Sequence, residues 1–144
     1  MFHKIVVALN ESREADRALA TAIHLAKSLN AELHAVTVAT GLPAYTAFAE
    51  AADPSLDLVL KIDRANSYEV LMAKVSALAS GNGIEIQRHL LDGNEVNTIA
   101  DFLRTQRADL LVVGLHQRDL YIARLWSTVY SLAQEAPCSV LGVH

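Results

Sequence analysis

The chain has 144 residues, of which 52% are hydrophobic and 19% charged, so it can fold as a single domain spanning residues 1–144 with a buried core. A formal net charge of −4 disfavours a general attraction to nucleic acid or to an acidic membrane surface. No apolar run reaches the roughly 20 residues of a membrane span, and the N-terminal apolar run is too short for a signal peptide, so we expect a cytoplasmic protein with neither nucleic-acid nor membrane partners.

The first part of the chain predicts two buried strands joined by an amphipathic helix. Ile5 to Leu9 is a continuous apolar run, as expected of a strand covered on both faces. The helix that follows has Asn10 or Ser12 as its N-cap and Asn30 as its end, with apolar residues at three- and four-residue spacing along one face. A second strand is predicted from Leu33 to Val38.

The segment from Leu42 to Arg64 is the least determined part of the sequence, and it is open whether it covers a site or is a surface excursion. Within it, Asp53 followed by proline indicates a helix start, and an apolar pattern then continues to Gly81. The polar stretch 61–69 leaves open a break in that helix. A third strand is predicted from Ile84 to Leu90, with one side solvated.

In the last part of the chain, predicted strands and helices alternate in the same way. A turn with Asn94 as a cap leads into a short helix over residues 96–103, and Leu110 to Val113 forms a fourth strand. A helix beginning near Ser127 and a final strand, Val140 to Val143, complete the pattern. Alternating strands and helices predict an α/β fold, namely a five-stranded, parallel, doubly wound sheet of the Rossmann-like type with helices on both faces.

The fourth strand and the residues after it have the frame of a phosphate site. Ligands of doubly wound sheets bind at the carboxyl ends of strands where the strand order reverses, so Asn10, Val38 and the Gly114 loop should surround one crevice. A helix start near Ser127 would add unpaired amides that favour anions. However, the loop after Gly114 lacks the further glycines that let backbone approach a phosphate closely.

Three segments of the chain resemble the universal stress protein family. They are the opening KIVVALNES, the strand and turn ADLLVVGLHQ, and the ending EAPCSVLGVH, in the family's order and spacing. Asp92-Gly93-Asn94 also falls where the family has the turn before its third helix. The resemblance covers essentially the full length, with 40–63 matching only in kind. It implies the family's adenine nucleotide alpha hydrolase-like fold and a role in the stress response.

ATP-binding members of that family carry Gly-x2-Gly-x9-Gly-[Ser/Thr] after the fourth strand. Here Gly114 is the first glycine, but Gln117 and Ser127 stand at the other two, before Thr128, and Asn10 replaces an aspartate. The chain is therefore similar to the branch with a degenerate ATP motif, and no cofactor is expected, with ATP or AMP as the alternative. The candidate nucleotide or anion site comprises these residues: Leu9, Asn10, Val38, Gly114, His116, Gln117, Arg118, Ser127 and Thr128.

No sequence motif nominates an enzyme. The six histidines lack zinc-site spacing, and the nucleophile elbow, the P-loop and the SGGxDS signature of nucleotidyl-transfer relatives are absent from the sequence. The single cysteine, Cys138, excludes an internal disulfide and is interpreted as packed.

The final segment, Ser139 to His144, is apolar and could leave a sheet edge open for pairing with another chain. The family resemblance implies an antiparallel homodimer through it, with Gly142 allowing close approach of the partner's backbone. The leading interpretation is thus a dimeric interaction or signalling module of the stress response, with unknown protein partners and no ATP turnover. The alternative is an adenine-nucleotide sensor with the same fold.

Overall fold

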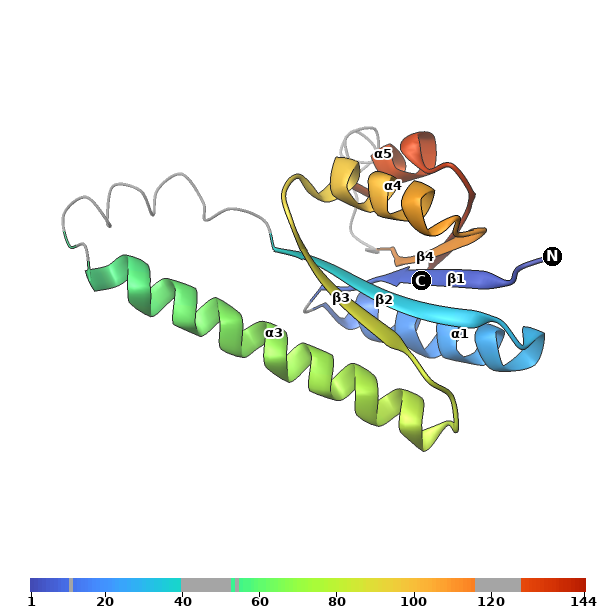
Figure 1. Cartoon of the computed structure of the whole chain (residues 1–144), viewed down its shortest axis with the longest axis horizontal. Coiled ribbons are helices and arrows are strands. Elements are labelled where there is room, and N and C mark those ends of the chain that lie inside the picture. The colour runs from blue at the N-terminus through green and yellow to red at the C-terminus, as the bar shows by residue number, and fades with distance from the viewer. Residues whose placement is uncertain (11, 40–52, 54, 116–127) are drawn as a thin grey trace.

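A five-stranded parallel sheet forms the centre of the protein (Figure 1). The computed structural model describes residues 1–10, 12–39, 53, 55–115 and 128–144. The strands, in the spatial order β3-β2-β1-β4-β5, are β1 (Lys4–Ala8), β2 (Glu32–Ala39), β3 (Gln87–Asp92), β4 (Leu110–Gly114) and β5 (Ser139–Val143). The helices are α1 (Arg13–Leu29), α3 (Ser55–Gly81), α4 (Glu95–Gln106) and α5 (Thr128–Glu135). The predicted fold class is confirmed.

Helices cover both faces of the sheet, because alternate residues of each central strand point to opposite sides. Ile5 and Val7 of β1 pack in a cluster with α1, whereas Val6, between them, packs with Leu103 of α4 and Leu132 of α5. Figure 1 shows α4 and α5 together on one side and α1 and α3 on the other. Burial on both faces explains why the strands are continuously apolar in sequence.

The predicted helix caps are confirmed by their hydrogen bonds. Ser12 Oγ accepts the Ala15 backbone N–H at 3.2 Å, and Asn30 ends α1 in the left-handed conformation with φ 53°. In α4, Asn94 Oδ1 accepts the Asn97 N–H at 3.2 Å. These local bonds satisfy amides that the first helical turn leaves unpaired.

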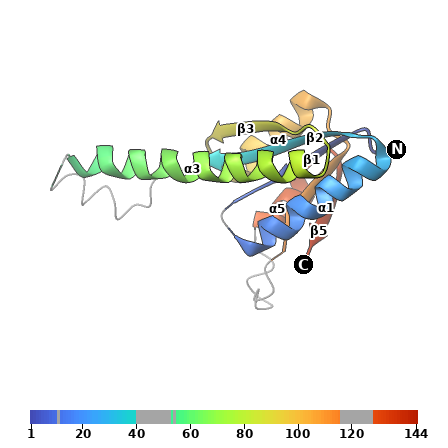
Figure 2. The same ribbon diagram turned by 90° about the horizontal axis from the view of Figure 1, so that it is seen from below.

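The third helix differs from the expectation that it could break, because α3 runs without interruption through 61–69. Arg64 Nη2 donates to Tyr68 Oη one turn later at 3.5 Å, a spacing that supports a helix. The N-terminal half of α3 extends beyond the sheet in two views (Figures 1 and 2). In that half, Leu58 and Val59 are 63% and 52% exposed.

The third strand begins later than predicted, at Gln87 instead of Ile84. Ile84 and Ile86 pack against the cluster beneath α1 before the backbone pairs with β2. Within β3 the half-buried side chains are His89 and Leu91, and the others are exposed. The spacing of apolar residues therefore predicted a strand start that is too early. Apolar residues indicate where side chains are buried, and they do not indicate where the backbone pairs with a neighbouring strand.

The last strand, β5, forms one edge of the sheet, as the sequence predicted. A Cβ on Gly142 would lie 2.7 Å from Leu115 Cδ1 of the same chain. Gly142 therefore leaves space for the Leu115 side chain of the same chain, a reason for glycine that the sequence did not reveal. Its predicted contact with a partner backbone stays a prediction.

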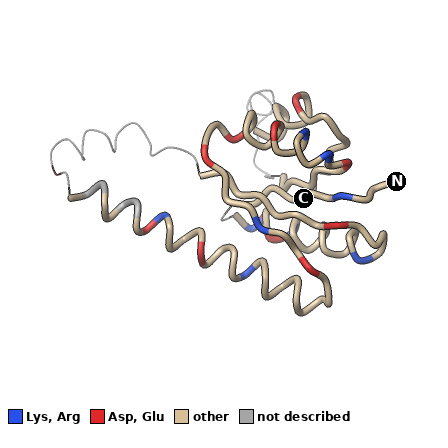
Figure 3. The backbone as a smooth tube through the Cα atoms, viewed as in Figure 1, with Lys and Arg blue, Asp and Glu red and all other residues tan. Residues whose placement is uncertain are grey.

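Acidic and basic residues are interspersed over the described backbone (Figure 3). On α3, for example, Asp63 is followed by Arg64, and Lys74 Nζ reaches across to Asp16 Oδ1 of α1 at 2.6 Å. Within the described residues, no helix is both long and apolar enough to cross a membrane.

Buried His34 of β2 and half-buried His89 of β3 form a pair that joins the two strands. His34 is 1% exposed, and its Nε2 donates to Glu32 Oε1 at 2.6 Å while its Nδ1 lies 2.9 Å from His89 Nε2. In the tautomer of a neutral His34 that donates from Nε2 to the carboxylate, Nδ1 accepts and His89 Nε2 donates. The two rings stack with centroids 5.2 Å apart, and Phe102 lies 4.7 Å from His89. Burial first, and the neighbouring His34 second, lower the pKa of His89.

We expect the free energy of unfolding to decrease as the pH falls below 6.5, the ordinary pKa of histidine. The unfolded chain binds a proton at His89 in that range, whereas the folded chain binds it only at lower pH, so protonation favours unfolding. The His89→Gln variant keeps an N–H donor for His34 Nδ1 and should lose this part of the pH dependence. Urea denaturation of both proteins on either side of pH 6.5 measures the difference. An equally steep decline in the variant would contradict the assignment.

Candidate functional site

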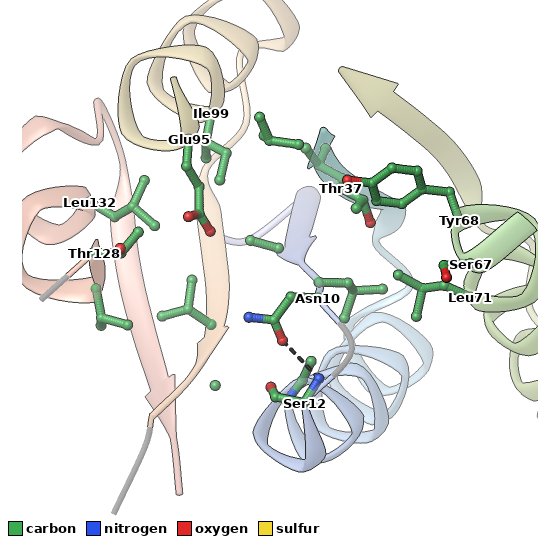
Figure 4. A pocket seen from close by; sticks show the side chains of 18 of the residues that line it. Asn10, Ser12, Thr37, Ser67, Tyr68, Leu71, Glu95, Ile99, Thr128 and Leu132 are labelled. Atoms are coloured by element: carbon green, nitrogen blue, oxygen red, sulfur yellow. Dashed lines mark hydrogen bonds between the residues drawn. The ribbon is translucent and has the colours of Figure 1, made fainter. Parts of the chain in front are cut away.

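A cavity of about 470 Å³ opens at the carboxyl ends of the central strands (Figure 4). Strands β1 and β4 are neighbours there, but the chain continues from β1 toward β2 and from β4 toward β5, so the strand order reverses between them. Doubly wound sheets bind ligands at such a point. Helices α3, α4 and α5 complete the walls.

The structure brings five of the predicted site residues together around this one cavity: Leu9, Asn10, Val38, Gly114 and Thr128. They come from the ends of β1, β2 and β4 and from the first residue of α5. The other four predicted residues, His116, Gln117, Arg118 and Ser127, lie outside the described residues. The crevice inferred from strand order is therefore present, and the ligand-binding role of each residue stays a prediction.

The end of β1 is held so that one side chain turns toward the cavity. The Leu9 backbone N–H donates to the Val36 carbonyl of β2 at 2.9 Å, which ties the end of β1 to its neighbour. Next along the chain, Asn10 Oδ1 accepts the Ser12 N–H at 3.0 Å. Since that backbone donor requires an oxygen, the amide nitrogen of Asn10 points the other way, into the cavity (Figure 4). It offers a hydrogen-bond donor there.

The structure explains why glycine occupies position 114, and the sequence did not reveal this explanation. A Cβ at this position would lie 2.5 Å from both the backbone carbon and the backbone oxygen of Glu14, in the first turn of α1. The glycine is thus needed where β4 packs against α1, whatever binds in the cavity. The sequence analysis explained this glycine only as part of a candidate phosphate site, and packing against α1 is a second explanation.

Sequence reasoning missed the contribution of α3, which lines one side of the cavity with Tyr68 and Leu71 among others. It also missed Thr37 of β2 and Glu95, the first residue of α4. Glu95 could have been predicted from the sequence, because it begins a helix that follows the carboxyl end of β3, and that helix start lies at the same edge of the sheet. The α3 residues could not have been predicted in this way. Apolar residues occur all around that helix, so the sequence does not show which of its faces turns toward the cavity.

The electrostatics of the cavity differ from one side to the other. Glu95 and Thr128 lie on one side, and Thr37 and Tyr68 on the other, with Asn10 between them (Figure 4). Burial raises the pKa of the Glu95 carboxyl above its ordinary value. As a carboxylate, this group opposes a highly charged anion beside it.

Other candidate chemistry is not supported by the described residues. Among them, no group of three or more His, Cys, Asp or Glu side chains is arranged to hold a metal ion. Cys138 is half-buried against the cluster beneath α4 and α5, and burial followed by the nearby Asp109 raises the pKa of its thiol. A raised pKa lowers the thiolate fraction, which agrees with a packed cysteine.

Comparison with known proteins gives one consistent family. The model of the universal stress protein family matches residues 1–144. The chain is 30% identical to universal stress protein MJ0531 of Methanocaldococcus jannaschii over 149 residues, which cover 99% of this chain and 82% of that protein.

Solved structures of similar proteins share the fold over the same length. A universal stress protein in complex with cAMP has a TM-score of 0.77 and 25% identity, covering 99% of this chain and 97% of that one. A universal stress protein family member from Burkholderia pseudomallei has a TM-score of 0.72 and 26% identity, covering 99% and 96%.

Proposed function

This chain belongs to the universal stress protein family, and from that premise we propose that it is a dimeric stress-response module that binds an adenine nucleotide with a single phosphate group. AMP and cyclic AMP are the nucleotides of this class. In this proposal the nucleotide is a signal, which the module senses without turning it over and passes to protein partners.

The observation that carries the proposal is the cavity at the β1–β4 switch point. Its volume of about 470 Å³ falls within the roughly 300–1,000 Å³ typical of small-molecule sites. Five side chains or backbone positions named from the sequence as nucleotide contacts line it together. A similar protein of known structure, 25% identical to this chain, was solved in complex with cAMP.

Two features favour a nucleotide with one phosphate group over a nucleotide with three. Gln117 and Ser127 occupy positions where ATP-binding relatives have glycine, and a Cβ there takes up space that backbone and phosphate would share. The carboxylate of Glu95, on the same side of the cavity as Thr128, adds repulsion that grows with the charge of the ligand. A single phosphate can still use the Asn10 amide and the start of α5.

The dimer in this proposal forms through β5. This strand is at the edge of the sheet, and Val140, Leu141 and Val143 in it are half-buried in the single chain. An edge strand presents unpaired backbone groups, and pairing with the same strand of a second copy across a two-fold axis would satisfy them.

Calorimetric titration of the nucleotide-stripped protein tests the ligand. We expect AMP or cyclic AMP to bind with a dissociation constant in the micromolar range, about −8 kcal/mol, and ATP with Mg²⁺ to bind at least about tenfold more weakly. As a matched comparison, the double variant Gln117→Gly with Ser127→Gly should gain affinity for ATP and change little toward AMP. Absence of binding by all three nucleotides would refute the nucleotide role, and ATP binding as tight as AMP binding would refute the single-phosphate preference.

A further inference from the structure

Thr37 is a buried polar residue at the carboxyl end of β2, and it lines the cavity. Its backbone is paired in the sheet, with Leu90 of β3 as its register partner. The residue is 3% exposed, so bulk water does not hydrate its side chain. Its neighbours on the same face of β2, Leu33 and Ala35, belong to the cluster beneath α1, which shows that Thr37 faces the side that carries α3.

The hydroxyl of Thr37 has no hydrogen-bond partner. Among the buried side-chain nitrogen and oxygen atoms of the described residues, Thr37 Oγ1 alone lacks one. A buried hydroxyl without a partner destabilises a folded protein, because it loses its bonds to water and gains none in return. A strand side chain with a branched Cβ also has few rotamers with which to find another partner. The hydroxyl therefore has no partner within the described protein, and its residue lies in the wall of the cavity.

The surroundings of Thr37 indicate which part of a nucleotide would reach it. On the α3 side of the cavity, Tyr68 and Leu71 supply aromatic and aliphatic surface, and Ser67 lies next to Leu71 (Figure 4). Of the groups suited to a phosphate, Asn10 and Thr128 lie elsewhere around the cavity, whereas Arg64 lines it from α3, one turn before Tyr68. A flat heterocycle with hydrogen-bonding atoms at its edge matches an aromatic and aliphatic surface that lies beside hydroxyl groups.

We propose that Thr37 is a specificity-determining residue whose hydroxyl hydrogen-bonds the edge of the nucleotide base, with Tyr68 and Leu71 forming the wall against which the base packs. This inference rests on the proposed function, because it names the contact that selects the base in the same cavity. A hydroxyl that both donates and accepts can pair with either kind of atom on the base. Binding would supply the partner that the empty protein lacks.

The test compares Thr37→Val with the wild type in two measurements. Without nucleotide, we expect Thr37→Val to have a higher urea midpoint, because valine has nearly the same shape and removes the unpartnered hydroxyl. With nucleotide, we expect its affinity for AMP to fall about tenfold, the loss expected for a hydrogen bond to an otherwise unpartnered group. Adenosine, which has the base and no phosphate, should show the same fold loss.

Two further variants complete the experiment. Thr37→Ser retains the hydroxyl and should keep AMP affinity within about threefold of the wild type, a difference of less than one hydrogen bond. Thr105→Val makes the same chemical change at an exposed position of α4 and should alter neither measurement.

The outcomes separate this inference from the proposed function. If the wild type binds AMP and Thr37→Val binds it equally well, the nucleotide role stands and the Thr37 contact is refuted. If Thr37→Val loses affinity for AMP but not for adenosine, the hydroxyl contacts the phosphate, and this result would also refute base recognition. A lower urea midpoint for Thr37→Val would show that the hydroxyl already has a partner. If the wild type binds neither AMP nor adenosine, the proposed function fails and the inference fails with it.

Discussion

Replacing Gly114 with alanine should lower the free energy of unfolding by about 3 kcal/mol, the upper range for overpacking a closely packed site. The added Cβ would lie 2.5 Å from the backbone carbon and oxygen of Glu14. These are backbone atoms of α1, so they cannot move away by a side-chain rotation. The β4 strand or the whole first turn of α1 would have to shift. Urea denaturation measures the effect.

The matched control is Gly81→Ala at the end of α3, where an added Cβ would meet no atom within 4 Å. It removes the same backbone freedom from the unfolded chain, so we expect a change of less than about 1 kcal/mol, in the stabilising direction. Equal losses in both variants would show that the clash with Glu14 is not the cause. A stable Gly114→Ala would mean that β4 and α1 lie farther apart than the structure shows.

Replacing Val140 with lysine should convert the proposed dimer to a monomer. Val140 lies on the edge strand β5 and is half-buried in the single chain, so a partner strand paired here would enclose a charge. An uncompensated buried charge costs at least about 3 kcal/mol, which corresponds to more than about a hundredfold in the dissociation constant of the dimer. In the monomer the lysine stem can lie along the cluster that Val140 contacts, with its charge in water. Sedimentation velocity measures the outcome.

The opposite edge of the sheet provides the control for this variant. Leu90 of β3 is 51% exposed, and Leu90→Lys makes a comparable change on the other edge strand. It should leave the sedimentation coefficient unchanged. If Val140→Lys stays dimeric while its circular dichroism remains native, the interface lies elsewhere. If Leu90→Lys dissociates and Val140→Lys does not, the partner pairs with β3.

The helix boundaries could be predicted where short-range chemistry decides them. Ser12 and Asn94 cap their helices through bonds to amides three residues away, and Asn30 closes α1 in a conformation that asparagine tolerates. In contrast, the start of β3 was misplaced because Ile84 and Ile86 are buried without being paired. Burial leaves a pattern in sequence, and strand pairing does not.

The candidate site was predicted in position but only partly in composition. Strand order alone brought Asn10, Val38 and Gly114 to one edge of the sheet, which the cavity confirms. Thr37 and Tyr68 were not predicted, because one polar residue in an apolar strand and one tyrosine in a long helix have many ordinary explanations. Their proximity depends on how α3 rotates and crosses the sheet, and no local pattern encodes that angle.

The sequence by itself determined the family, the parallel α/β architecture, the helix caps and the edge of the sheet at which the cavity lies. The family follows from the resemblance of three segments, and the other features follow from residue periodicity and turn chemistry, which act over a few neighbouring positions. Only the tertiary structure decided that Gly114 is required by Glu14, that Gly142 makes room for Leu115, and that the Thr37 hydroxyl is buried beside the cavity without a partner. Each of these depends on a distance between side chains or backbone of different elements, and such distances are set when the helices pack against the sheet.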